Sequence, residues 1–243
     1  MKKTAVFALL LTAVTNTVVA PISASHKNEH RVIGTSVQGR PIEATRYGTP
    51  GGVVVVVIGV IHGDEDAGLL ITKALGQSTV PNGIDLWLVP TINPDGTALS
   101  RRTNANQVDL NRNFPYAWSK IGKPGYWQYA GNRRASEPET KAIIKFLREI
   151  KPDLGIWYHQ NLNIISPGTG LEGKLRERYS QLTDTPLKRI TGGRYTGVAV
   201  TWQHNTFTSG YGFVVELGSS LSIEQARLHA TAVLQTAMLL RDS

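Results

Sequence analysis

Cysteine is absent from this 243-residue chain, which excludes a disulfide framework, a thiolate metal site and a cysteine nucleophile. No GxSxG sequence occurs either, so the nucleophile elbow of a serine hydrolase is missing. Residues 168–174 have the glycines of a phosphate-binding loop, but Leu175 stands where a Ser or Thr would hold magnesium, and no apolar strand precedes them. We interpret that segment as a turn before a helix.

Long apolar runs are also lacking, except at the N-terminus. Lys2 and Lys3 precede an apolar stretch that reaches Ala20, which is typical of an export signal. The stretch is short and rich in threonine, so an uncleaved membrane anchor is the weaker alternative. We predict cleavage after Ala24, since Pro21 disfavours cleavage at Ala20. The protein is then exported, periplasmic or secreted, without stable membrane insertion.

The chain carries 26 basic and 18 acidic residues, a net charge of +8, and loss of Lys2 and Lys3 leaves a charge of +6. The basic residues are scattered and are not interleaved with aromatics, so we expect no nucleic-acid partner. The charge instead favours an anionic cell envelope or acidic substrates. Residues 25–243 contain no linker, and we expect them to form a single catalytic domain with a sizeable core. The sequence does not predict an oligomeric state.

Apolar runs of strand length recur along the chain and alternate with helical patterns. Strands are predicted at residues 53–60, 84–90, 154–158 and 213–217, with a hairpin turn between two further strands at residues 36–42. Helices are predicted at 67–75, from a capping box at 136–139 to residue 151, and from a capping box at 222–225 to about residue 240. This alternation predicts an α/β fold, a single domain with a mixed central β-sheet flanked by helices.

Three candidate metal ligands lie at the ends of predicted strands. His62 and Glu65 follow the run at 53–60, and His159 follows the run at 154–158. Ligands bind beyond the strand ends in open sheets of this type. Two imidazoles and one carboxylate leave a fourth position open for water, the arrangement of a catalytic zinc site, and we predict one Zn²⁺ ion. His204 is the alternative third ligand, although no apolar strand precedes it.

Five further side chains are candidates for the chemistry around such an ion. Glu216 interrupts a dry apolar run, so we assign it as the general base, with a position on the solvent face of an edge strand as the alternative. Asp109 is a candidate partner for the other ring nitrogen of a metal-binding histidine. Arg112 and Asn111 are suited to gripping a carboxylate, and Arg102 to stabilising an oxyanion.

Taken together, these residues resemble the zinc carboxypeptidase family, which includes pancreatic carboxypeptidases and bacterial murein peptide amidases. The resemblance covers nearly all of residues 25–243 and rests on segments 38–42, 62–65, 93–96, 102–104, 108–115, 136–140, 159–160 and 216–217. It implies that His62, Glu65 and His159 hold zinc and that Glu216 is the catalytic base.

The same resemblance assigns the substrate contacts. It implies that Arg102 faces the scissile carbonyl, that Asn111 and Arg112 bind the terminal carboxylate, and that Asp109 pairs with the first zinc histidine. The family's substrate-capping tyrosine falls near Tyr195, although the spacing to the base differs by a residue or two. The chain is shorter than the digestive enzymes, which makes it similar to bacterial enzymes that cut cell-wall peptides.

The leading hypothesis is therefore an exported zinc metallocarboxypeptidase that cleaves a terminal amide or peptide bond next to a free carboxylate. The γ-D-glutamyl-diaminopimelate bond of murein peptides is its specific form. A general carboxypeptidase for ordinary peptides and a deacylase for N-acyl amino acids are alternatives within the hydrolases. From another class, a catalytically inactive carboxylate-binding protein of the same fold remains an alternative.

Overall fold

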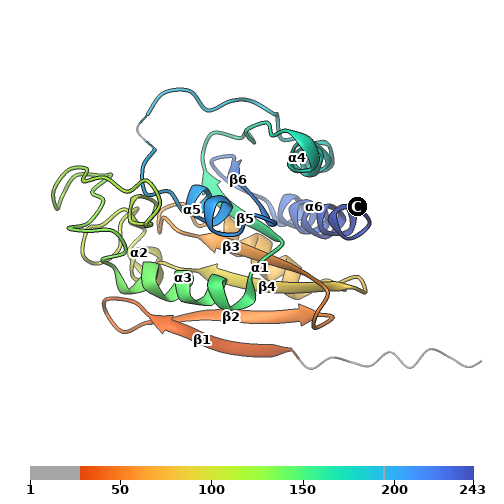
Figure 1. Ribbon diagram of the computed structural model, residues 1–243, viewed down its shortest axis with the longest axis horizontal. Helices are drawn as coiled ribbons and strands as arrows, with labels where there is room; N and C mark the ends of the chain where they lie inside the picture. The colour runs from red at the N-terminus through yellow and green to blue at the C-terminus, as the bar shows by residue number, and fades with distance from the viewer. Residues whose placement is uncertain (1–27, 194) are drawn as a thin grey trace, which may run out of the picture.

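The computed structural model describes residues 28–193 and 195–243, shown in Figure 1. The predicted export signal and its cleavage point after Ala24 lie outside these residues. None of the described helices combines the length and the apolar character that crossing a bilayer requires.

Strands and helices alternate along most of the chain. The strands are β1 (Glu29–Thr35), β2 (Pro41–Gly48), β3 (Val53–Val60), β4 (Ile84–Thr91), β5 (Leu154–Gln160) and β6 (Tyr211–Leu217). The helices are α1 (Gly68–Gly76), α2 (Pro94–Ala98), α3 (Pro138–Ile150), α4 (Gly170–Thr183), α5 (Ala199–Thr206) and α6 (Ile223–Arg241), with one 3₁₀ turn, η1 (Leu110–Arg112). The predicted strands, the hairpin turn and the helix at 67–75 are confirmed within two or three residues.

The six strands form one mixed sheet in the order β1-β2-β4-β3-β5-β6. The first two strands form an antiparallel hairpin that joins β4, whereas β4, β3, β5 and β6 run parallel to one another. The predicted fold, a mixed central sheet flanked by helices, is confirmed. Because parallel strands end at the same edge, the segments that follow β3, β4, β5 and β6 meet there.

Helices cover both faces of the sheet (Figure 1). One core lies between the sheet and α1, α4 and α6, and the other lies between the sheet and α3 and α5. Val55 and Val57 of β3 face the first core, and Val56 and Ile58 face the second. A strand that is buried on both faces is apolar throughout, which explains the unbroken run of valines.

The two predicted capping boxes have different outcomes. Ser222 begins α6 as predicted, since its hydroxyl accepts a hydrogen bond from the Gln225 amide (3.1 Å) and the Gln225 side chain accepts one from the Ser222 amide (2.8 Å). The box predicted at Ser136 is wrong. The cap of α3 is Glu137, and the Ser136 hydroxyl donates to its carboxylate (2.5 Å). Glu139, which the box requires, is buried and accepts a hydrogen bond from the β1–β2 turn instead.

Gln203 fixes α5 against β5 and β6. Its side-chain oxygen accepts a hydrogen bond from the Trp157 indole (2.8 Å), and its nitrogen donates to the Tyr211 carbonyl (3.1 Å). This close approach requires Gly155 in β5, because a Cβ there would lie 2.2 Å from the Gln203 side chain. The amide is almost fully buried and both of its ends are paired, so α5 forms a fixed wall beside β6.

Candidate active site

His62 and Glu65 lie in the tight turn that follows β3. The turn is closed by a hydrogen bond from the Glu65 amide to the His62 carbonyl (3.0 Å). Gly63 allows this turn to lie against α2, because a Cβ at Gly63 would come within 2.0 Å of the Gly96 backbone. A larger residue at position 63 would therefore move both side chains away from the strand end.

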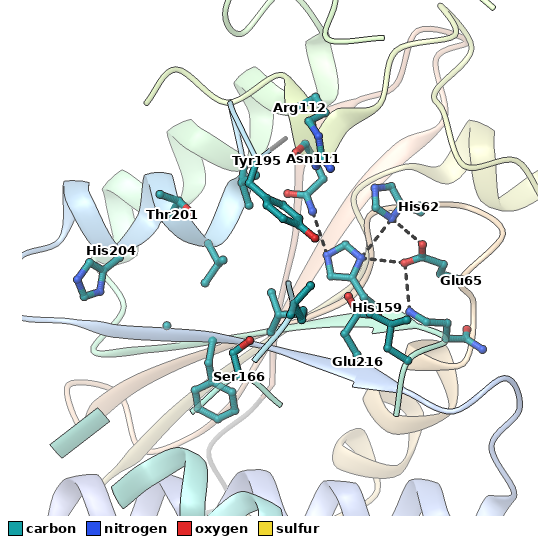
Figure 2. A pocket seen from close by; sticks show the side chains of 18 of the residues that line it. His62, Glu65, Asn111, Arg112, His159, Ser166, Tyr195, Thr201, His204 and Glu216 are labelled. Atoms are coloured by element: carbon teal, nitrogen blue, oxygen red, sulfur yellow. Dashed lines mark hydrogen bonds and ion pairs between the residues drawn. The ribbon is translucent and has the colours of Figure 1, made fainter. Parts of the chain in front are cut away.

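The predicted metal ligands His62, Glu65 and His159 meet at one point, shown in Figure 2. The Nδ1 atoms of His62 and His159 are 3.2 Å apart. The two Glu65 oxygens lie 2.9 Å from His62 Nδ1 and 2.8 Å from His159 Nδ1. Within the part of the chain that the structure describes, His204 is not a member of this group.

The donor atoms suit a zinc ion in both type and spacing. Two nitrogens bound to one tetrahedral zinc at about 2.0–2.1 Å lie roughly 3.3 Å apart, which agrees with the separation of the two Nδ1 atoms. Lone pairs that face each other at this distance repel unless a proton or a cation lies between them. Two imidazoles and a carboxylate are also the ligand set of catalytic zinc sites, so the residues fit the metal that the sequence predicts.

Each imidazole is held in place through its other nitrogen. His62 Nε2 lies 3.0 Å from a carboxylate oxygen of Asp109, which is fully buried. His159 Nε2 lies 3.2 Å from the side-chain amide of Asn111, whose oxygen accepts a hydrogen bond from the Ala199 amide (2.9 Å). Asp109 thus takes the position predicted for it, and Asn111 gains a contact that the sequence did not predict. Asp109 accepts from His62 Nε2 as such a partner does, whereas Asn111 contacts His159 Nε2 through its amide nitrogen; both contacts fix the orientation of the rings.

Buried charges shape the protonation of this cluster. Burial opposes ionisation of Glu65 and Asp109, but the attraction of His62 outweighs it and holds the pKa of both carboxyls well below the usual range. Burial also disfavours charge on His62, yet Asp109 and Glu65 raise its pKa. Burial lowers the pKa of His159. The carboxylates are therefore anionic at neutral pH, as metal binding requires.

Glu216 lies beside the cluster on the next strand. It pairs with His159 in the parallel register of β5 and β6, so the two side chains point to the same face of the sheet. Burial, followed by the negative charge of Glu65, raises the pKa of Glu216 to about 7. β6 is the last strand of the sheet, but Ile164 pairs with Glu216 on its outer side, and Glu216 is only partly exposed. A carboxyl group with a pKa of about 7 can gain or lose a proton near neutral pH.

Arg102 contacts the predicted metal ligand Glu65 and the partner of His62, Asp109. Its guanidinium lies 3.0 Å from a Glu65 oxygen and donates to Asp109 through Nε (3.2 Å) and Nη2 (2.9 Å). The indole of Trp127 covers it, with the Arg102 Cζ atom 5.1 Å from the ring centroid. Arg102 lines the pocket, and its positive charge offsets part of the negative charge of the carboxylates.

Arg112 and Tyr195 lie together near Asn111 (Figure 2). The Arg112 guanidinium is 5.5 Å from the Tyr195 ring centroid, and its Nη1 donates to the Asn111 carbonyl (2.8 Å). Arg112 Nε is buried and has no hydrogen-bond partner among the described residues. Burial lowers the pKa of Arg112. In Figure 2 the Tyr195 hydroxyl points toward His159.

These side chains line one pocket with a volume of about 700 Å³. The predicted residues that line it are His62, Glu65, Arg102, Asn111, Arg112, His159, Tyr195 and Glu216. Sequence reasoning missed Trp127, Glu172 and Arg176, which also line it. The last two form an ion pair one helical turn apart, and that spacing was the available signal.

Comparison with known proteins gives a consistent result. Residues 20–185 match the zinc carboxypeptidase family. Tyr195 and Glu216 lie beyond the matched residues. Murein peptide amidase A of Escherichia coli K12 is 32% identical over 158 residues, which cover 60% of this chain and 64% of the relative. The chain thus matches slightly less than two thirds of that relative's length. Carboxypeptidase SOL1 of Arabidopsis thaliana is 32% identical over 61% of this chain and 32% of the relative.

Solved structures share the fold. The murein-tripeptide amidase of Escherichia coli O157 superposes with a TM-score of 0.69 at 25% identity, covering 87% of this chain and 91% of that one. Carboxypeptidase A of Helicoverpa armigera superposes with a TM-score of 0.76 over 89% of this chain and 69% of that one. At 19% identity, the second likeness concerns the fold alone.

Proposed function

Because this chain belongs to the zinc carboxypeptidase family, we propose that it is an exported zinc-dependent hydrolase that releases a terminal residue bearing a free carboxylate. One observation carries the proposal: two imidazole nitrogens and a carboxylate converge on one point at the carboxyl edge of the sheet, inside a pocket. His62, Glu65 and His159 would hold a single ion there. A zinc ion in this position supplies a Lewis acid that polarises the scissile carbonyl and promotes attack by water.

Glu216 supplies the proton transfer in this proposal. Its carboxylate takes a proton from the attacking water and passes it to the nitrogen of the leaving amine. Burial favours the protonated form of Glu216 and raises its pKa, which supports a role in accepting a proton and then giving it up. Arg102, whose guanidinium lies 3.0 Å from a Glu65 oxygen, is proposed to donate to the oxyanion that develops on the carbonyl.

Arg112 is proposed to bind the terminal carboxylate of the substrate. Its buried Nε lacks a partner among the described residues, and an N–H group of this kind is stabilised by an anionic acceptor. Asn111 lies next to it and fixes His159. Tyr195 covers the guanidinium and is proposed to close over a bound substrate. These contacts select a free carboxylate over an amide.

Murein peptides are the proposed substrates, cleaved at the γ-D-glutamyl-diaminopimelate bond. The names of two similar bacterial proteins support this choice, a murein peptide amidase and a murein-tripeptide amidase. The proposal also includes removal of residues 1–24 on export. The mass of the protein recovered from outside the cytoplasm tests this part, since a mature chain begins at Ser25.

The central experiment is incubation of the zinc-loaded protein with murein tripeptide and with ordinary tripeptides, followed by mass analysis of the products. We expect release of diaminopimelate. This release should stop when zinc is removed by a chelator and return when zinc is added back. Equal release from ordinary peptides identifies a general carboxypeptidase. Carboxylate-dependent binding without release of any residue identifies a binding protein and contradicts the proposed hydrolase.

Arg112→Ala tests the carboxylate contact directly. We expect kcat/KM to fall roughly 100-fold for the acid substrate, because a charged hydrogen bond is lost, and to change little for the C-terminal amide. Arg133→Ala is the matched control, since Arg133 is an exposed loop arginine outside the pocket. Equal losses on the acid and the amide would remove Arg112 from carboxylate binding.

A further inference from the structure

An exposed tryptophan bounds the pocket at the end away from α5. In Figure 2, Glu65 and His204 of α5 lie on opposite sides of His159. The Arg102 guanidinium lies against Glu65, and the indole of Trp127 covers that guanidinium. Trp127 lines the pocket and is 57% exposed, so much of its ring is free to contact a ligand. The pocket therefore has a wall beside Glu65 as well as the wall that α5 forms.

Gln128, the next residue, carries a side-chain amide without a partner. It also lines the pocket, although it is only 9% exposed. Its amide makes no hydrogen bond to any residue that the structure describes, and neither amide atom is fully enclosed by protein. The amide therefore faces the pocket. A buried polar group that stays unpaired costs about 1–3 kcal/mol, so a ligand that pairs with it is stabilised.

The backbone holds Gln128 in a fixed place. The Tyr129 amide donates to the Tyr126 carbonyl (2.9 Å), which closes a turn that contains Gln128. The Tyr129 carbonyl accepts from the Asp109 amide (2.8 Å), and the Asp109 carboxylate contacts His62. The turn is thus tied to the residue that orients a predicted metal ligand. A side chain carried by such a turn loses little backbone freedom when a substrate binds.

The acyl part of the proposed substrate lies at this end of the pocket. Because Arg102 is proposed to donate to the oxyanion of the scissile carbonyl, groups beside Arg102 contact the acyl part and not the released residue. In a γ-glutamyl linkage the scissile carbonyl belongs to the side chain, so the main-chain carboxylate of that residue stays free. An ordinary peptide has no carboxylate at this place. The N–H groups of a glutamine amide can donate to such a carboxylate.

We propose that Gln128 is a specificity-determining residue that binds the free main-chain carboxylate of the γ-linked residue on the acyl side. This inference rests on the proposed function, since it takes the position of the acyl part from the role of Arg102. The amide nitrogen of Gln128 donates to the carboxylate, and the indole of Trp127 packs against the adjacent methylene groups. A substrate that lacks this carboxylate leaves the amide unpaired.

The test compares three substrates that end in diaminopimelate and differ in the residue before it, which is γ-D-glutamyl, D-isoglutaminyl or γ-aminobutyryl. D-Isoglutaminyl has a neutral amide in place of the carboxylate, and γ-aminobutyryl has the same chain with neither group. We expect kcat/KM to be roughly 10- to 100-fold higher for glutamyl than for aminobutyryl, the effect of one charge-assisted hydrogen bond, with isoglutaminyl between them. Equal values for glutamyl and aminobutyryl would overturn the role of Gln128.

Two variants attribute the preference to this residue. Gln128→Leu removes the amide, and we expect the ratio of kcat/KM for glutamyl over aminobutyryl to fall toward one. In Gln128→Glu the ratio should fall below one, because two carboxylates repel each other. Gln181→Leu is the matched control and should keep the parental ratio, since Gln181 is exposed on α4 and does not line the pocket. A parental ratio in Gln128→Leu would contradict the proposal. Partial unfolding lowers both rates together and leaves the ratio unchanged.

Calorimetry with the acyl products L-alanyl-D-glutamate and L-alanyl-γ-aminobutyrate separates this inference from the proposed function. Tighter binding of the first product that Gln128→Leu abolishes, together with no turnover of any substrate, contradicts the hydrolase and supports Gln128 as the carboxylate-binding residue. Turnover of all three substrates without a preference in rate or binding supports the hydrolase and overturns the role of Gln128.

Discussion

Two buried histidine clusters lie on opposite faces of β5, and they differ in how their polar atoms are satisfied. Tyr158 and His159 are consecutive and point to opposite faces. On one face, the Tyr158 hydroxyl meets the Tyr179 hydroxyl (2.7 Å), which in turn lies 2.8 Å from His229 Nδ1. On the other face, His159 Nδ1 meets His62 Nδ1 and the Glu65 carboxylate.

The tyrosine cluster is complete without any ligand. Burial raises the pKa of Tyr158 and of Tyr179, so both hydroxyls stay protonated and can donate. Burial lowers the pKa of His229 to about 4, so its ring is neutral at pH 7 and Nδ1 can accept. Each of the two hydroxyls therefore has an acceptor. Around His159, two imidazole nitrogens and the Glu65 carboxylate converge on one point instead, and all three can bind one cation. Convergent acceptors, more than buried histidines as such, distinguish a metal site from a structural one.

The same substitution in both clusters tests whether only the cluster around His159 binds zinc. We expect His159→Asn to weaken zinc binding on the order of 10²- to 10³-fold, the share of one ligand in a typical zinc-binding energy of ~10–16 kcal/mol, and to abolish turnover. We expect His229→Asn to leave zinc affinity unchanged. Competition with a chelating dye measures both affinities.

In metal-free protein, we expect His229→Asn to lower the free energy of unfolding more than His159→Asn does. His229→Asn is expected to destabilise the fold by about 1–2 kcal/mol through lost packing and hydrogen bonding, whereas His159→Asn removes the close approach of the two Nδ1 atoms (3.2 Å) and should have a smaller effect. If His229→Asn weakened zinc binding as much as His159→Asn, the two clusters would not be independent.

Glu216→Gln tests whether the proposed proton carrier is distinct from the proposed metal ligands. We expect turnover to fall about 10²- to 10⁴-fold, the usual contribution of a general base, while zinc affinity stays within a few-fold of the parent. Bound zinc per chain and the steady-state rate are the two measurements. Loss of zinc together with activity would make Glu216 a fourth ligand; parental rates would remove it from the mechanism.

The pH dependence of stability reports on the tyrosine cluster. His229 has a pKa of about 4 when folded, against about 6.5 in an unfolded chain, so the unfolded state binds the proton first. The stabilising effect is fully present above pH 6.5 and is lost as the pH falls toward 4, by up to about 3 kcal/mol. Urea unfolding of the parent and of His229→Asn at several pH values measures it. The stability advantage of the parent over His229→Asn, about 1–2 kcal/mol near pH 7, should shrink as the pH falls and change sign toward pH 4, because the expected loss of about 3 kcal/mol exceeds it. A constant difference would contradict the neutral ring.

Much of this arrangement could be predicted from the chain because short-range patterns determine it. The valine run of β3 ends at the turn that holds His62 and Glu65, and the run of β5 ends at His159. The rule that parallel strands end at one edge then brings them together. The start of α6 was also predictable, since Ser222 and Gln225 satisfy each other locally.

Other features depend on contacts between distant segments. The box at Ser136 failed because Glu139 is required by a turn about 100 residues earlier, which no local pattern indicates. The contact of Asn111 with His159 depends on where η1 lies against β5. The sequence predicts a turn before a helix at Glu172, whereas the residue lies inside α4, and its place in the pocket depends on how α4 packs beside β6. Spacing alone cannot give these positions.

The substitution Tyr179→Phe is expected to have the smallest effect. Tyr179→Phe removes the one hydroxyl that joins Tyr158 to His229 and leaves the aromatic ring in place. We expect a loss of about 1–2 kcal/mol, because His229 Nδ1 becomes a buried acceptor without a donor. The pKa of His229 should change little, since burial is its cause. Zinc affinity and turnover should equal those of the parent, because Tyr179 packs on the face opposite the ligands. A change in either would show that the two faces of β5 are coupled through the strand.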